Sequence, residues 1–257
     1  MEFFRRGNMN DIIEKLKSLQ KRTLVKNIHT KVLFLSVPRS GSTYLCDVIS
    51  QLELLGIPDE WLNPAYIVEL PKEVIDLQNS ESIQNFVEFI LYKTASSNGI
   101  FSLNLHLSSH EWWIRNGFNW IDIIGFDVIY FIYRKDKYAQ AYSYALAHHK
   151  NKWRQKEKIM KVEPVEDLSF HQIFEFLATI LNLEYSYEKN IKPMVHREFV
   201  YEDFSTQIED TIKLIASDLN IHIDEIPKSN LQIQRKGYAQ EPLSDFRSFM
   251  QSKIQNL

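Results

Sequence analysis

Short apolar runs alternate with amphipathic stretches along this chain. Residues 32–37, 100–106 and 127–133 are apolar runs of strand length, and 195–201 is a candidate for a fourth. Such continuous runs are typical of strands buried on both faces of a parallel sheet. Apolar residues at helical intervals predict helices over residues 10–26, 42–55, 71–94, 137–152, 170–188 and 207–219. The range 71–94 is long enough for one or two helices. The alternation predicts an α/β fold of three layers, a central parallel sheet flanked by helices.

The two ends of the chain differ from this regular pattern. Residues 1–30 include an amphipathic stretch rich in charges, for which we expect a peripheral N-terminal helix. Residues 231–257 are polar, and we expect them to wrap back over the sheet. Because the sequence shows no internal repeat, low-complexity tract or linker, we expect 1–257 to form a single domain.

Composition limits the classes of function. The chain has 257 residues, of which 44% are hydrophobic and 25% charged, as in ordinary globular proteins. Its net charge of −3 gives no general attraction to nucleic acid or anionic lipid, so we expect no nucleic-acid partner. Cys46 is the only cysteine, which excludes an internal disulfide and favours a reducing compartment. With neither an apolar run of about 18 residues nor a secretory signal, we expect a cytoplasmic protein without a transmembrane segment.

One stretch combines a strand, a glycine turn and the start of a helix. It runs from Lys31 to Cys46 and reads KVLFLSVPRSGSTYLC. A loop that ends a strand and opens a helix directs backbone N–H groups and the positive end of the helix dipole at one point. Gly41 would let the chain approach an anion, while Ser42 and Thr43 would cap the helix and offer hydroxyl donors. The same residues are also compatible with a plain strand-to-helix turn.

An ATP- or GTP-binding loop is the first alternative for this stretch. That motif requires Gly-x4-Gly-Lys-Ser/Thr, and here its first glycine and its lysine are both missing. Nucleotide hydrolases also place an aspartate for Mg²⁺ after a second strand. The corresponding strand here ends in Tyr133-Arg134, which suits a second anion, and we expect no metal.

Further basic residues follow the glycine loop. Arg134 ends a strand, and Ser143 comes about two turns into the next helix. Arg235, Lys236 and Gly237 form another basic group. Each group by itself is also compatible with a solvated surface charge. Together with the loop they indicate a ligand with two separated anionic ends.

These elements, in this order, resemble the PAPS-dependent sulfotransferases, where PAPS is 3′-phosphoadenosine 5′-phosphosulfate. The resemblance is closer to the bacterial Stf0-type branch, which includes trehalose 2-sulfotransferase, and covers residues 31–250. The segments that carry it are VPRSGSTYLC at 37–46, GIPDEW at 56–61, YRKDKYAQAYS at 133–143, YEDF at 201–204 and RKG at 235–237.

The resemblance implies a P-loop-like sulfotransferase fold and a role for each segment. Residues of the loop would hold the phosphosulfate bridge of PAPS, namely Arg39, Ser40, Gly41, Ser42, Thr43 and Tyr44. A second set would hold its 3′-phosphate, namely Arg134, Ser143, Arg235, Lys236 and Gly237. The sulfuryl group would pass in line to the hydroxyl of a carbohydrate or another small acceptor. The resemblance also implies a homodimer.

Two residues are candidates for the base that activates the acceptor hydroxyl. Glu60 matches the glutamate that serves as base in the Stf0-like branch, and we expect it to act so here. His106 ends the second predicted strand, somewhat like the strand that carries the catalytic histidine of eukaryotic members. Arg39 would assist by stabilising charge on the bridging oxygen. Asn104 departs from the lysine expected at its position, so a polar contact near the transfer site would differ.

Other functions remain open at this point. The chain would be a non-catalytic PAP- or PAPS-binding protein if it had kept the nucleotide cradle without the base. A nucleotide kinase with an atypical P-loop is a further alternative. Trp112 and Trp113 are candidates either for stacking on a sugar or for core packing, and we expect the latter.

Overall fold

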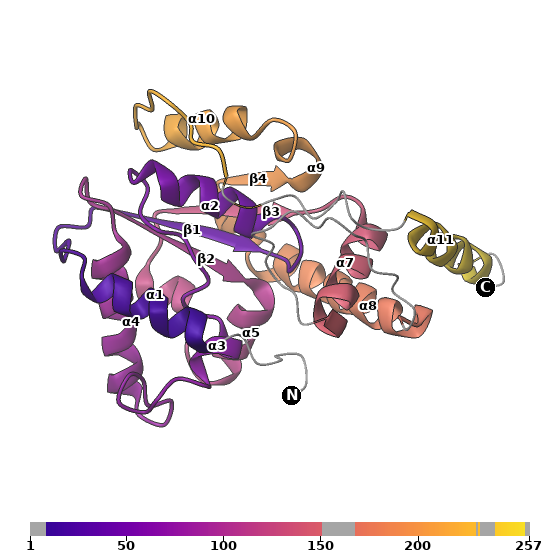
Figure 1. The fold of residues 1–257 in the computed structure, drawn as a ribbon, viewed down its shortest axis with the longest axis horizontal. Helices are drawn as coiled ribbons and strands as arrows, with labels where there is room; N and C mark the ends of the chain where they lie inside the picture. Colours follow the sequence, from indigo (N-terminus) through magenta and orange to yellow (C-terminus); the bar gives the residue numbers. More distant parts are fainter. Residues whose placement is uncertain (1–8, 151–167, 230, 232–239, 255–257) are drawn as a thin grey trace.

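A computed structural model describes residues 9–150, 168–229, 231 and 240–254. Four parallel strands form its sheet, in the order β2-β1-β3-β4. They are β1 (Thr30–Ser36), β2 (Ile100–His106), β3 (Val128–Tyr133) and β4 (Arg197–Val200). The predicted α/β fold with a central parallel sheet is therefore confirmed (Figure 1).

The helices lie on both faces of this sheet. They are α1 (Met9–Gln20), α2 (Ser42–Leu52), α3 (Pro64–Ile67), α4 (Ser80–Thr94), α5 (Leu107–Arg115), α6 (Trp120–Ile124), α7 (Lys137–Lys150), α8 (Phe170–Asn190), α9 (Tyr201–Phe204), α10 (Ile208–Asp218) and α11 (Gln240–Ile254), with a 3₁₀ turn at Lys192–Met194. None of the helices in the described part of the chain combines the length and hydropathy that a transmembrane span requires.

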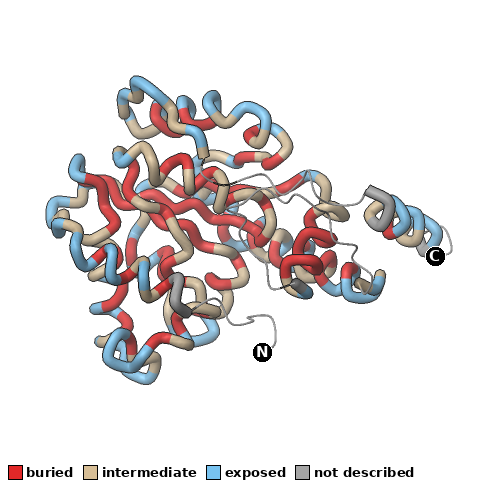
Figure 2. Tube along the Cα trace, viewed as in Figure 1, coloured by how far each residue is buried: buried red, intermediate tan, exposed pale blue. Residues whose placement is uncertain are grey.

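Alternating side chains of the central strand separate two hydrophobic cores. Val32 and Phe34 of β1 pack with α2 and α10 on one face. Leu33 and Leu35 point to the opposite face, which α1, α4, α5, α7 and α8 cover. All four residues are at most 1% exposed, so β1 is buried on both sides (Figure 2). This explains why its sequence is a continuous apolar run rather than an alternating one.

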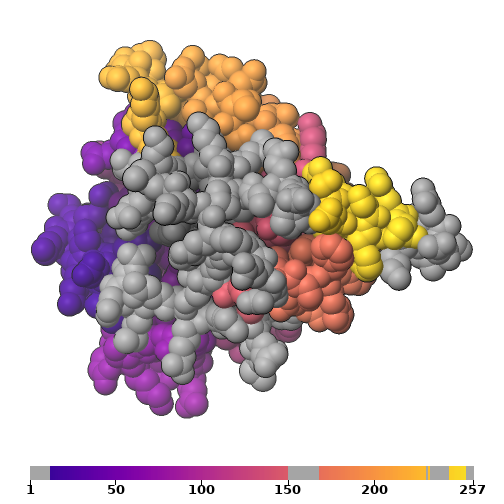
Figure 3. Space-filling model, turned by 45° about the vertical axis from the view of Figure 1, so that its right-hand side comes forward, coloured from indigo at the N-terminus to yellow at the C-terminus, as the bar shows by residue number. Residues whose placement is uncertain are grey.

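The C-terminal residues differ from their prediction. Residues 240–254 form helix α11, which lies beyond the carboxyl ends of the strands and beside α8 (Figure 1, Figure 3). Phe246 is fully buried there against Tyr138 and Phe170, and Phe249 also contacts Phe170. The expectation that this stretch wraps over the sheet was wrong for α11, because its few aromatic residues pack on α7 and α8 instead.

Several short elements were also not predicted. Helices α5 and α6 follow β2 directly, where the sequence indicated no helix. They are only 9 and 5 residues long, too short to show a helical period. Trp113 and Trp120 are buried in them, at 1% and 0% exposure, with their rings 5.4 Å apart. Core packing of Trp113 is thereby confirmed.

Candidate functional site

The candidate site lies at the carboxyl edge of the sheet, where the strand order reverses around β1. The chain passes from β1 to β2 on one side and then returns to β3 on the other. Ser36 is paired in register with His106 of β2 and Ile132 of β3. Ligands of open α/β sheets bind at such a switch point. The loops after β1, β2 and β3, which carry the predicted site residues, therefore converge at one edge.

The loop after β1 begins with a tight turn at Pro38 and Arg39. The Ser40 N–H donates to the Val37 carbonyl at 3.3 Å, and Arg39 adopts a φ of 65°. Proline followed by a residue with positive φ is the signature of a type II turn, whose third position normally takes glycine. A left-handed arginine costs roughly 1–2 kcal/mol. The Gln140 side chain donates to the Pro38 carbonyl at 2.8 Å and holds the turn against α7.

Gly41 completes this loop and cannot be replaced without strain. Its φ is 83°, and a Cβ at this position would lie 2.4 Å from Cδ2 of Tyr201. Gly41 itself is the N-cap of α2. The expectation that Ser42 and Thr43 cap the helix was therefore wrong, because both residues lie inside its first turn. Ser42 is buried, and the Thr43 hydroxyl faces the Glu60 carboxylate at 3.5 Å.

The Arg39 side chain extends toward helix α7. Its Nε donates to the Ser143 hydroxyl at 3.2 Å, although 104 residues separate the two in sequence. Ser143 is 4% exposed, so this contact is shielded from solvent. The Ser40 hydroxyl, in the same loop, is fully buried and has no hydrogen-bond partner within the described ranges. A buried hydroxyl of this kind is a donor that a ligand can use.

Glu60 has a hydrogen-bonded carboxylate in the turn before α3. Its Oε2 accepts from the Asn63 amide at 2.7 Å. Its Oε1 faces the Thr43 hydroxyl at 3.5 Å and His106 Nε2 at 3.4 Å. The Glu60 and His106 side chains are 12% and 13% exposed. Two of the three predicted catalytic residues, Glu60 and His106, are thus neighbours.

The backbone around Glu60 is held at several points. Asp59 Oδ1 accepts the Glu60 N–H at 2.8 Å, and the Asp59 carbonyl accepts the Asn104 N–H at 3.3 Å. The Trp61 indole donates to the Ile57 carbonyl at 2.9 Å. The Trp113 indole likewise donates to the Leu62 carbonyl at 2.8 Å. The turn is consequently fixed from both β2 and α5.

His106 is oriented by β1. Its Nδ1 lies 3.2 Å from the Ser36 hydroxyl, which in turn lies 3.5 Å from the Asn104 amide oxygen. Ser36 and Asn104 are 0% and 1% exposed, so this chain of polar groups is buried beneath the site. Asn104, the residue that departs from the expected lysine, therefore contacts Ser36 at the floor of the site.

Arg134 immediately follows β3 and is held by α9. Its Nε lies 3.4 Å from Glu202 Oε1, and its guanidinium lies 4.8 Å from the centre of the Tyr201 ring. Glu202 also accepts the N–H groups of Lys135 and Asp136, at 2.9 and 3.2 Å. Burial raises the pKa of Glu202, but these two N–H groups, its own backbone N–H and Arg134 together outweigh burial, so its pKa lies below the ordinary value. Glu202 is therefore a fixed negative charge beside Arg134.

Tyr201 connects the glycine loop and the Arg134 segment. The same ring that lies beneath Arg134 contacts the Gly41 backbone, which explains why a Cβ would clash there. Tyr44 on α2 is half-buried near it, and its pKa is raised mainly by burial, with smaller contributions from the neighbouring Tyr201 and Asp47. The YEDF segment, predicted only as a structural element, thus positions both Gly41 and Arg134.

Sequence reasoning missed two further residues of the site. Tyr144 is 5% exposed, and burial raises its pKa to about 12 while Arg39 lowers it and Glu60 raises it. It remains a neutral hydroxyl near both charges. Asn63 donates a hydrogen bond to Glu60, which lies three residues earlier in the sequence. This short separation was the signal from which the contact could have been predicted. The predicted Arg235, Lys236 and Gly237 lie outside the described residues.

Comparisons with known proteins found one matching family and several similar solved structures. A sequence model described as Stf0 sulphotransferase matches residues 31–242. No curated protein matches the sequence. Among solved structures, the "Sulfotransferase Domain from the Curacin Biosynthetic Pathway" is 16% identical with a TM-score of 0.42, covering 77% of this chain and 76% of its own. The "Sulfotransferase Domain from the Synechococcus PCC 7002 Olefin Synthase" is 17% identical with a TM-score of 0.40, and the match covers 80% of this chain and 78% of that domain. Because the family match spans most of its length and includes Arg39, Glu60 and Arg134, this chain belongs to the Stf0 sulphotransferase family.

Proposed function

We propose that this sulfotransferase moves the sulfuryl group of PAPS to a hydroxyl of a carbohydrate or another small acceptor. One observation carries the proposal. A carboxylate, Glu60, and a guanidinium, Arg39, lie on loops at the same edge of the sheet. Helix α2 contacts Glu60 through Thr43, and helix α7 contacts Arg39 through Ser143. General-base removal of a proton and stabilisation of a developing negative charge require these two groups.

The donor groups at this edge fit PAPS. They combine two arginines, hydroxyls and the N-terminus of α2, all of which favour anionic oxygen. The buried Ser40 hydroxyl is a donor directed to no other described group. Arg39 and residues 40–44 would hold the phosphosulfate bridge, while Arg134 and Ser143, with Arg235, Lys236 and Gly237, would hold the 3′-phosphate. When bound, PAPS supplies an activated sulfuryl group and a phosphate leaving group.

Glu60 would take the proton from the acceptor hydroxyl, with its carboxylate oriented by neighbouring side chains. Asn63 holds Oε2 at 2.7 Å, and Thr43 and His106 face Oε1 at 3.5 and 3.4 Å. His106, oriented by Ser36, would hold the carboxylate in place and is the alternative base if Glu60 is not essential.

Arg39 would balance the charge that develops as the bridging oxygen leaves. Its planar guanidinium stays charged at all relevant pH values and can form two parallel hydrogen bonds. The contact with Ser143 fixes its direction before any ligand binds. A preorganised donor of this kind contributes more to the transition state than to the ground state.

Three finer points belong to the proposal: the acceptor and the homodimer rest on the family resemblance, and the location rests on the sequence. We take the acceptor to be a sugar or another small hydroxylated molecule, since related enzymes act on such compounds. A homodimer and a cytoplasmic location belong to the same proposal. Cys46, the only cysteine, is buried, which is compatible with a reducing compartment.

Incubation with labelled PAPS and a panel of sugars, glycolipids and phenols tests the function. We expect a sulfated product by mass spectrometry from at least one alcohol, with one equivalent of PAP released. Glu60→Ala is expected to abolish transfer but to leave PAP binding intact. If PAP binds tightly while no alcohol accepts sulfate, the chain is a binding protein rather than an enzyme.

A further inference from the structure

Helix α1 lies before the family match yet contacts the loop that carries Glu60. The Lys15 ammonium donates to Asp59 Oδ2, and it also lies 5.9 Å from the centre of the Trp61 ring. Asp59 and Trp61 are the residues on either side of Glu60 in sequence. The family match begins at residue 31, so a cation from outside it contacts both neighbours of the carboxylate.

Asp59 transmits this contact to Glu60. While Oδ2 accepts from Lys15, Oδ1 accepts the Glu60 N–H at 2.8 Å, so one carboxylate joins the lysine to the Glu60 backbone. The Lys15 and Asp59 side chains are 27% and 19% exposed. Partly buried pairs are screened less by water and salt than surface pairs, so this ion pair has a larger effect than an ordinary surface one.

The attachment of α1 does not depend on Lys15. Ile12, Leu16 and Leu19 lie on one face of the helix and are 5%, 7% and 3% exposed in the core. Beyond the helix, Arg22 Nε donates to the Lys93 carbonyl at 3.0 Å, and Lys93 Nζ donates to the Gln20 carbonyl at 3.0 Å. Apolar packing and the end of α4 thus hold α1, and Lys15 is left to contact the Glu60 loop.

We infer that Lys15 is a positioning residue for the Glu60 carboxylate, an inference that rests on the proposed function. It would act in two ways. By holding Asp59, it keeps the Glu60 backbone in the orientation that directs the carboxylate toward Thr43 and His106. By its charge, it offsets the negative charge of Asp59 next to Glu60.

The charge effect has a definite sign. Among the described residues, the titratable or charged groups near Glu60 include His106 from β2, Asp59 and Lys15 beside it, Arg39 from the loop after β1 and Tyr144 from α7. Removal of the lysine takes a positive charge away from the neighbourhood of Glu60, which disfavours the ionised form of its carboxylate. Because the base must be ionised, the acidic limb of the rate profile moves to higher pH.

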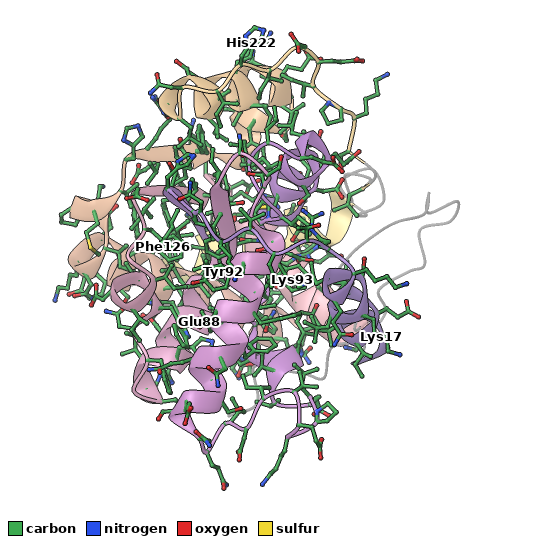
Figure 4. The ribbon with its side chains drawn as sticks, turned by 90° about the vertical axis from the view of Figure 1, so that its left-hand side faces the viewer. Lys17, Glu88, Tyr92, Lys93, Phe126 and His222 are labelled. Carbon is green, nitrogen blue, oxygen red and sulfur yellow. The ribbon has the colours of Figure 1, made fainter. Side chains whose placement is uncertain are left out.

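Lys15→Met tests the inference, with Lys15→Arg as the conservative variant and Lys17→Met as the matched control. Lys17 is exposed on the same helix and lies at the outer edge of the molecule (Figure 4). We expect Lys15→Met to lower kcat about tenfold with an unchanged KM for PAPS, since small displacements of a reacting group are costly. In a plot of kcat against pH, the acidic limb of this variant should lie at higher pH than that of the parent protein. Lys15→Arg should restore most of the activity, and Lys17→Met should match the parent protein.

A double-mutant cycle with Asp59→Asn separates positioning from general folding. If Lys15 acts through Asp59, adding Asp59→Asn to Lys15→Met causes little further loss of kcat. Full additivity of the two losses would overturn the inference. So would a Lys15→Met protein with parental kcat and pH profile while Glu60→Gln is inactive. If Glu60→Gln keeps its activity instead, the proposed base is wrong, and that result is distinct from failure of the Lys15 inference.

Discussion

The turn at Glu60 and the segment at Arg134 both present one charge at the carboxyl edge of the sheet, but in opposite surroundings. Glu60 is surrounded by an amide, a hydroxyl and an imidazole. Arg134 is held by a carboxylate and an aromatic ring. The first set can exchange or share a proton, whereas the second neutralises and orients a permanent cation. One edge of a sheet can therefore hold a group suited to proton transfer beside one suited to anion binding.

This difference also appears in what each region requires from distant parts of the chain. The Glu60 turn takes contacts from β2, α1, α2 and α5. In the described part of the chain, Arg134 is contacted from α9, by Tyr201 and Glu202. We expect activity to respond to changes in the first region and nucleotide binding to changes in the second.

Glu60→Gln is expected to have the largest effect. It keeps the shape of the side chain but removes the base, so transfer should fall by about 10²–10⁴-fold. PAP binding, measured by calorimetry, should stay unchanged because Glu60 is not among the residues proposed to hold the nucleotide. His106→Gln serves as the comparison and should lose less. Parental transfer by Glu60→Gln, with loss in His106→Gln, would instead make His106 the base.

Replacement of Arg39 comes next, with an expected loss of about 10²–10³-fold in transfer for both Arg39→Ala and Arg39→Gly. The two variants differ in stability. Glycine relieves left-handed strain of roughly 1–2 kcal/mol at φ 65° but adds an entropy cost of about 0.5–1 kcal/mol. Urea unfolding should therefore show Arg39→Gly within about 1 kcal/mol of the parent and more stable than Arg39→Ala. A destabilised glycine variant would show that the Arg39 side chain supports the fold.

Arg134→Met should weaken PAP binding and affect little else. Hydrogen bonds to charged groups contribute about 1.5–3 kcal/mol, which corresponds to roughly 10–100-fold in the dissociation constant. Glu202 would keep its two backbone N–H donors, so the fold should persist. Arg115→Met is the control, because Arg115 is 72% exposed on α5. Equal binding by both variants would remove Arg134 from the nucleotide site.

The parts of this site that sequence reasoning predicted are those encoded locally. The turn at Pro38, the glycine before α2 and the arginine after β3 are each marked by adjacent residues, and all three lie at the predicted edge. Contacts such as Lys15 with Asp59 or Tyr201 with Gly41 join segments far apart in sequence, so no periodic pattern reports them. The role of Arg235, Lys236 and Gly237 stays a prediction.

Replacement of Glu202 is expected to have the smallest effect, and this effect is on the pH dependence of stability. The folded pKa of Glu202 lies below the ordinary value, so between the two values the unfolded chain binds more protons than the folded one. Stability from this group is complete above the ordinary pKa of a glutamate and is lost as pH falls through the folded pKa. Glu202→Gln should therefore be less stable than the parent at pH 7, with a difference that shrinks in acid.

Urea unfolding of the parent and of Glu202→Gln at several pH values between 7 and 3 measures this difference. Glu225→Gln, at an exposed position in the loop after α10, is the matched control and should follow the parent curve at every pH. The effect is modest because Glu202 is only partly buried, so solvent screens its interaction with Arg134. A stability difference that stays constant as the pH falls would mean that Glu202 acts through packing. The Arg134 segment would then not depend on a fixed negative charge, and the contrast with the Glu60 turn would be lost.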